Sequence, residues 1–129
     1  MGTKRLFLAA RLDSFRYAGN GIAVMLRSQH NAWLHALATV VVCLVAFYLG
    51  VTRAEWCCIV LTMVTVWSAE ALNTALEFLA NAVAPTPHPL IKKAKDVAAG
   101  AVLLAVAGAI IIGVLILGPR LAALLRGSA

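Results

Sequence analysis

The stretch VAAGAVLLAVAGAIIIGVLILG, residues Val97–Gly118, decides the fold of this chain, because it holds no charged residue over 22 positions. About 20 apolar residues are enough for a helix to cross the hydrocarbon core of a bilayer. The whole chain has 129 residues, of which 63% are hydrophobic and 12% are charged. A soluble domain carries about 25% charged residues, and a core this small could not hide so much apolar surface. We therefore predict an all-α membrane protein that forms a single domain over residues 1–129.

Two more membrane spans are predicted before this stretch. Residues 33–50 contain no Asp, Glu, Lys or Arg, and Trp33 and Tyr48 lie near the ends, where aromatic belts form. Residues 54–83 are long enough to cross the bilayer and project beyond it. Prolines at 85, 87 and 89 then end that helix. We expect three transmembrane helices, at 33–50, 54–83 and 97–118.

The N-terminal segment 4–28 has a different pattern. Leu8, Leu12 and Phe15 recur at helical spacing, and Arg11 and Arg16 fall between them. An amphipathic helix of this kind lies in the membrane interface with its apolar side down. We predict a surface helix here.

Basic residues predict the orientation. Five Lys or Arg precede the first span and three lie between the second and third spans, so eight face one side and three the other. The positive-inside rule places the N-terminus on the cytoplasmic side of a bacterial inner membrane. Bases that flank apolar spans suit anionic membrane lipids as partners, and we expect no nucleic acid.

A row of small residues marks one face of the last span. Ala101, Ala105, Ala109 and Gly113 recur every four residues. Such a row lets helix backbones approach closely in lipid. Simple richness in alanine is the alternative explanation.

Polar residues form a stripe on the second predicted span. Glu70, Asn73 and Glu77 are spaced i, i+3 and i+7, and Asn81 extends the stripe by a turn. Carboxylates inside a membrane helix are costly and indicate function, the alternative being a buried polar contact between helices. The stripe is therefore the first candidate for a site.

A second polar cluster opens the third predicted span. It consists of Lys92, Lys93, Lys95 and Asp96, and the topology places it at a depth similar to that of the stripe. Carboxylates, an amide and a lysine together suit Mg²⁺ and a polyphosphate. No Walker A motif or Gly-rich kinase loop is present.

Three segments resemble one family. Residues 69–77, AEALNTALE, resemble the E-x-x-N-[ST]-A-x-E signature of prokaryotic diacylglycerol kinases and their undecaprenol kinase relatives. Residues 94–102, AKDVAAGAV, resemble a second motif of that family, and residues 15–18, FRYA, resemble its N-terminal helix. The resemblance extends over about residues 11–118.

The resemblance implies a lipid kinase with an N-terminal surface helix and three transmembrane helices, usually a homotrimer with sites shared between subunits. Such an enzyme transfers the γ-phosphoryl group of Mg-ATP to the hydroxyl of diacylglycerol or undecaprenol at the cytoplasmic face. ATP and a lipid alcohol would be the substrates and Mg²⁺ the cofactor.

The resemblance also implies residue roles. Glu70 would be the catalytic base, Asn73 would support the site, and Glu77 and Gln29 would bind the metal. Gln29 and Asn81 stand where this family usually has acidic residues. The residues implied in nucleotide binding are Tyr17, Gln29, Glu77, His88, Lys95 and Asp96.

Two alternatives remain open from the sequence. Gln29 and Asn81 suit a diverged, non-catalytic membrane protein that binds lipid or nucleotide without turnover. Glu70 and Glu77 would also suit a small proton-coupled transporter with a relay inside the membrane. Phosphorylation of lipid alcohols separates both alternatives from a kinase.

Overall fold

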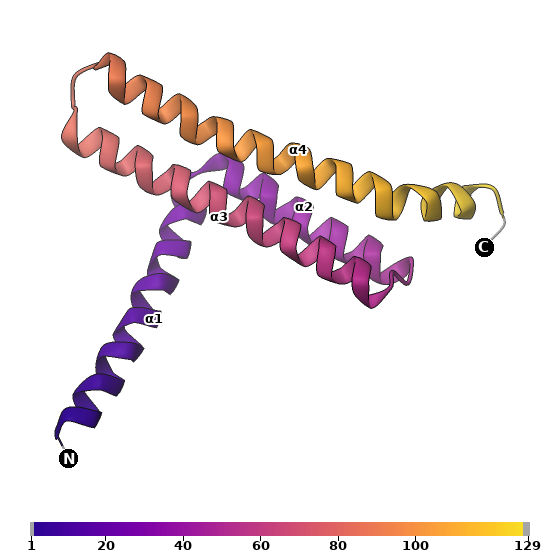
Figure 1. Ribbon diagram of the computed structural model, residues 1–129, viewed down its shortest axis with the longest axis horizontal. Helices are drawn as coiled ribbons and strands as arrows, with labels where there is room; N and C mark the ends of the chain where they lie inside the picture. The colour runs from indigo at the N-terminus through magenta and orange to yellow at the C-terminus, as the bar shows by residue number, and fades with distance from the viewer. Residues whose placement is uncertain (1, 128–129) are drawn as a thin grey trace.

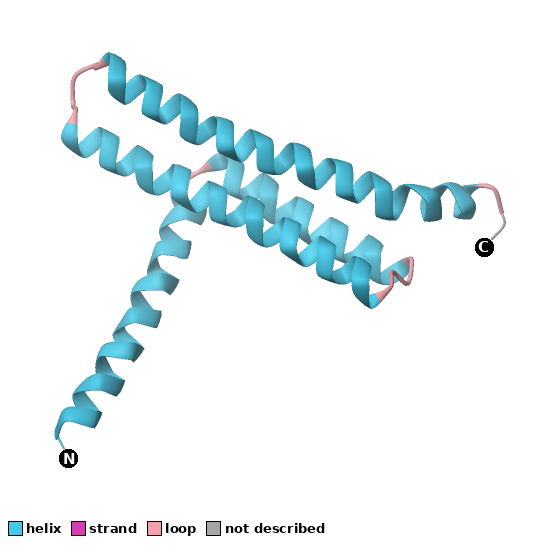
Figure 2. Cartoon of the chain, viewed as in Figure 1, coloured by secondary structure: helices cyan, strands magenta, loops and turns pink. Residues whose placement is uncertain are grey.

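Four helices make up the fold. The computed structural model describes residues 2–127, with side chains from residue 11 onward, and this part contains no strand. Helices α2, α3 and α4 run side by side as a bundle, and α1 leaves it at a steep angle (Figure 1). Short loops connect them (Figure 2). The helices are α1 (Gly2–Ser28), α2 (His30–Tyr48), α3 (Arg53–Val83) and α4 (Pro89–Leu125).

The prediction of an all-α membrane protein is confirmed. Three of the described helices, α2, α3 and α4, are long and apolar enough to cross a membrane. At about 1.5 Å per residue, the 31 residues of α3 and the 37 of α4 exceed the roughly 30 Å of a hydrocarbon core. Part of the α3–α4 hairpin therefore extends beyond the hydrocarbon.

Local sequence signals set the ends of α3 and α4. Thr52 caps α3, because its hydroxyl accepts from the Glu55 N–H while the Glu55 carboxylate accepts from the Thr52 N–H at 2.7 Å. Helix α4 begins at Pro89, and the ring Nδ1 of His88 accepts from the Leu90 N–H at 3.2 Å. Proline suits the first turn of a helix because its missing N–H needs no partner there. Helix α4 therefore starts well before the apolar span 97–118.

An apolar cluster and an ion pair hold the bundle together at the end where α2 passes into α3, called the fastened end below. Ala46, Val51, Ile59 and Leu117 form a buried apolar cluster there. Beside it, the Arg120 guanidinium donates to both oxygens of Glu55, at 2.7 and 2.8 Å. A bidentate pair is geometrically specific, so it fixes the register between the start of α3 and the end of α4.

The small-residue row leaves open space beside Gly113. A Cβ added at Gly113 would meet no heavy atom within 4 Å. Ala109 and Gly113 line an open cavity. The described chain therefore leaves the space beside Gly113 unfilled, and close packing of this row against another helix stays a prediction.

Candidate functional site

Glu70 is the most deeply buried polar group of the described chain. Its side chain is 1% exposed, and neither carboxylate oxygen has a hydrogen-bond partner. A buried carboxylate without partners is costly, so a membrane helix keeps one only where something else uses it. Thr74, on the next turn, donates its hydroxyl to the Glu70 backbone carbonyl and leaves the carboxylate free.

Glu77 lies two turns beyond Glu70 and contacts two amides. The Gln29 side-chain nitrogen donates to it at 2.9 Å, and the Asn73 nitrogen lies 3.5 Å from its other oxygen. The structure thus brings together Gln29, Asn73 and Glu77, which the sequence assigned to one site. The Asn73 carbonyl oxygen is buried without a partner.

The break between α1 and α2 places Gln29. This residue is the N-cap of α2 and has an extended backbone, with φ −113° and ψ 118°. Its backbone N–H donates to the Met25 carbonyl, and its own carbonyl accepts from Ala32. These two bonds fix the corner, and the side chain at the corner reaches α3.

Lys95, which belongs to α4, contacts the polar stripe of α3. Its ammonium group lies 3.4 Å from the Asn81 side-chain oxygen, one turn beyond Glu77. Asp96 has a different partner, because Lys92 contacts it at 2.6 Å on the exposed surface of α4. No contact in the described chain links Asp96 to the stripe.

Tyr17 and His88 also lie apart from the stripe. Tyr17 is 70% exposed on α1, which projects away from the bundle (Figure 1). His88 is occupied in capping α4. One chain alone therefore does not assemble the complete set of nucleotide-binding residues implied by the resemblance.

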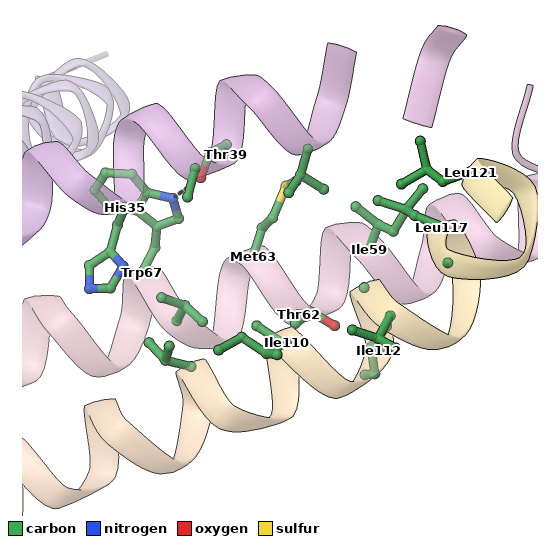
Figure 3. A pocket seen from close by; sticks show the side chains of 18 residues that line it. His35, Thr39, Ile59, Thr62, Met63, Trp67, Ile110, Ile112, Leu117 and Leu121 are labelled. Carbon is green, nitrogen blue, oxygen red and sulfur yellow. Dashed lines mark hydrogen bonds between the residues drawn. The ribbon is translucent and has the colours of Figure 1, made fainter. Parts of the chain in front are cut away.

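An apolar cavity of about 430 Å³ opens between α2, α3 and α4 (Figure 3). Ile59, Met63 and Leu117 line it toward the fastened end of the bundle, and His35 and Trp67 line it toward the polar stripe. Glu70 lies one turn beyond Val66, which also lines the cavity. A lipid chain in this cavity would therefore end close to the carboxylate.

Sequence reasoning missed two contacts between helices, one at this site and one at the other end of α3. His35 lies 3.9 Å from the Glu70 carboxylate, a contact between α2 and α3 that no local motif announces. The pairing of Glu55 with Arg120 was missed as well. The capping box of Thr52 and Glu55 could have been predicted, because T-x-x-E at 52–55 is its sequence signature.

The polar residues around Glu77 fit a hard cation only together with outside ligands. Within residues 2–127 no group of three or more His, Cys, Asp and Glu side chains could hold a metal. Glu77 and the amide oxygens of Gln29 and Asn73 are oxygen donors, and Mg²⁺ is often bound by one or two carboxylates plus substrate phosphates. The unpartnered oxygen of Asn73 supports this fit, since a cation would satisfy it.

Comparison with known proteins agrees with the resemblance found in the sequence motifs. A sequence model of the family described as prokaryotic diacylglycerol kinase matches residues 16–117. The chain is 40% identical over 108 residues to an undecaprenol kinase of Bacillus subtilis, which covers 84% of this chain and 88% of the relative. It is also 40% identical over 115 residues to a diacylglycerol kinase of Synechocystis, covering 88% of this chain and 66% of that relative. No solved structure matches.

Proposed function

This chain belongs to the prokaryotic diacylglycerol kinase family, and from that premise we propose that it transfers the γ-phosphoryl group of Mg-ATP to a membrane lipid alcohol. The relatives are named as kinases of lipid alcohols, and they indicate that this chain is a phosphotransferase with a lipid alcohol as acceptor. The acceptor is diacylglycerol or undecaprenol, and the reaction takes place at the cytoplasmic face of the inner membrane.

One observation supports this function most strongly: Glu70 is buried and unpartnered beside the end of an apolar cavity. In the proposed reaction, the acceptor hydroxyl gives its proton to Glu70 and its oxygen attacks the γ-phosphorus. The bond from that phosphorus to the bridging oxygen of ADP breaks. The products are a lipid phosphate, ADP and a protonated Glu70, which returns its proton to water.

The nucleotide lies on the cytoplasmic side of Glu70. Glu77, Gln29 and Asn73 would hold Mg²⁺, which when bound neutralises phosphate charge. Lys95 places a further positive charge near the phosphates, at a position set by its contact with Asn81. These residues orient the γ-phosphate toward the acceptor hydroxyl.

The acceptor's hydrocarbon chain occupies the cavity between α2, α3 and α4. Its wall is almost entirely apolar, and the polar atoms of Thr39 and Trp67 bind each other at 3.1 Å. Among the residues that line the cavity, His35 is the polar residue close to the Glu70 carboxylate. A lipid alcohol therefore enters with its hydroxyl toward Glu70.

Neighbouring copies complete the nucleotide site in a homotrimer. Tyr17, His88 and Asp96 make no described contact with the stripe of their own chain, although the family motif assigns them to the nucleotide. A second copy can bring such residues to Glu77, since one three-helix chain cannot surround a bound nucleotide.

The test is phosphorylation by purified protein in nanodiscs that contain diacylglycerol, undecaprenol or another lipid alcohol, with Mg-ATP in the surrounding buffer. We expect lipid phosphate from the wild type and a loss of about 10²- to 10⁴-fold in kcat for Glu70→Gln. Asp13→Asn is the matched control, because it makes the same carboxylate-to-amide change at an exposed position of α1. It should keep most of the activity.

Each other outcome has a meaning. Retained activity in Glu70→Gln would reject this residue as the base. ATP binding by the wild type with no product on any lipid alcohol would favour the non-catalytic alternative, and proton-driven flux in liposomes would favour the transporter.

A further inference from the structure

The proposed base has one charged or titratable side chain at ion-pair distance among the residues that the structure describes. The ring Nε2 of His35 lies 3.9 Å from the Glu70 Oε2 atom. The His35 side chain is 17% exposed, so it sits at the boundary between the buried carboxylate and the open cavity. A group arriving through the cavity meets His35 before it reaches Glu70.

Neighbouring side chains hold the His35 ring in place. The Trp67 ring packs against it edge to face, with centroids 6.5 Å apart and planes at 69°. Trp67 is itself fixed, because its indole N–H donates to the Thr39 hydroxyl at 3.1 Å (Figure 3). The imidazole is therefore oriented by a contact chain between α2 and α3, which suits a residue with a directional task.

We propose that His35 is a positioning residue for Glu70, an inference that rests on the proposed kinase function. The Nε2–H group donates to one carboxylate oxygen and leaves the other oxygen to accept the proton of the lipid hydroxyl. The 3.9 Å separation is longer than a hydrogen bond. Contacts of this kind are often long without substrate and tighten when substrate binds.

The geometry disfavours a purely space-filling role for His35. Glu70 has two buried carboxylate oxygens without any hydrogen-bond partner. His35 carries the ring N–H that lies close enough to donate to one of them once the two side chains move together. An apolar residue at position 35 would fill the same space and leave both oxygens unserved. A metal-binding role lacks support too, because no cluster of three metal-binding side chains occurs within residues 2–127.

Kinetics of two variants test the proposal. His35→Phe keeps the ring volume and removes the donor, and we expect kcat to fall by about 10- to 100-fold, the range seen when orienting partners are removed elsewhere. KM for ATP should not change. His35→Gln restores an N–H donor at similar reach and should recover most of the lost rate. His30→Phe, an exposed position one and a half turns earlier on α2, is the matched control.

A double variant separates an action through Glu70 from an independent one. In the Glu70→Gln background, His35→Phe should cause no further loss, because the group that it positions is already absent. Additive losses would overturn the proposal. So would a fully active His35→Phe, or equal activities of the Phe and Gln variants. Loss in His35→Phe with retained activity in Glu70→Gln would make His35 itself the base, which also contradicts the proposal.

A spectroscopic readout keeps the test independent of turnover. With ¹⁵N-labelled histidine, the His35 Nε2 resonance should move between wild type and Glu70→Gln, whereas the resonances of His30 and His88 should stay in place. An unmoved His35 resonance would overturn the pairing even in an active enzyme. A moved resonance in a wild type that phosphorylates no lipid would reject the kinase function while leaving the contact established.

Discussion

A single amide decides how Glu77 is balanced. The Gln29 side-chain nitrogen donates to this carboxylate at 2.9 Å. This contact stabilises the Glu77 carboxylate without a cation, because the Gln29 amide donates a hydrogen bond to the negative charge. A glutamate at position 29 would place two carboxylates at the same contact, and like charges at this distance repel unless a cation lies between them.

Gln29→Glu should therefore make the protein depend more strongly on Mg²⁺. In the absence of Mg²⁺, we expect the variant to have a lower melting temperature than the wild type. Adding Mg²⁺ should raise the melting temperature of the variant more than that of the wild type. The half-saturating Mg²⁺ concentration in the kinase assay should be lower for the variant. Thermal unfolding with and without Mg²⁺ measures the first two. Gln29→Met, which has no donor and no charge, is the control. An unchanged Mg²⁺ titration would place Gln29 outside the metal site.

At the scale of helices, α4 presents the small residues Ala109 and Gly113 to the cavity between α2, α3 and α4. Gly113 lines this cavity, and a Cβ there would touch nothing within 4 Å. Gly108 has equally open surroundings but does not line the cavity. The two glycines of one helix therefore form a matched pair for testing what the cavity holds.

Gly113→Leu should obstruct the acceptor without unfolding the protein. We expect KM for the lipid alcohol to rise about tenfold or more, since a filled cavity excludes apolar chain surface from burial. KM for ATP should stay constant, and Gly108→Leu should behave as wild type. Lipid titrations in nanodiscs measure both constants. Equal lipid affinity in the two variants would place the acceptor chain elsewhere.

At the scale of the whole molecule, α1 and the outer face of α4 point away from the stripe. Tyr17 is exposed on the first, and Asp96 pairs with Lys92 on the second. A trimer with shared sites predicts that two inactive variants rescue each other. Glu70→Gln mixed with Asp96→Asn in equal amounts should recover up to about one quarter of wild-type activity, because random assembly leaves that share of interfaces intact.

Native mass spectrometry of the same samples measures the number of chains per particle. Each variant alone should be a trimer with little activity, which is the control for misassembly. Absence of rescue in correctly mixed trimers would show that Glu70 and Asp96 act within one chain.

Orientation in the membrane is the second property of the whole molecule. The eight basic residues before the first span and between the last two spans predict that Ser28 faces the cytoplasm and Arg53 the other side. In a background without Cys43, Cys57 and Cys58, a membrane-impermeant maleimide added to spheroplasts should label Arg53→Cys. Ser28→Cys should react only after the membrane is opened. The reverse pattern would place the nucleotide site outside the cell.

Much of the architecture follows from local sequence. The charge-free run 97–118 and the prolines after residue 84 act on their own segments, so membrane insertion and the α3–α4 turn need no tertiary contact to be predicted. The spacing of Glu70, Asn73 and Glu77 likewise fixes a polar stripe through helix geometry alone. Family motifs then assign chemistry to that stripe.

The tertiary structure decided the rest, because those features depend on distances between helices. His35 and Glu70 are 35 residues apart and meet only once α2 packs on α3. Glu55 and Arg120 are 65 residues apart, and neither spacing nor composition pairs them. Ala109 and Gly113 became part of a cavity wall only because α2, α3 and α4 together enclose that cavity. Local sequence thus determined the elements and their polar faces, whereas packing determined the neighbours of each functional group.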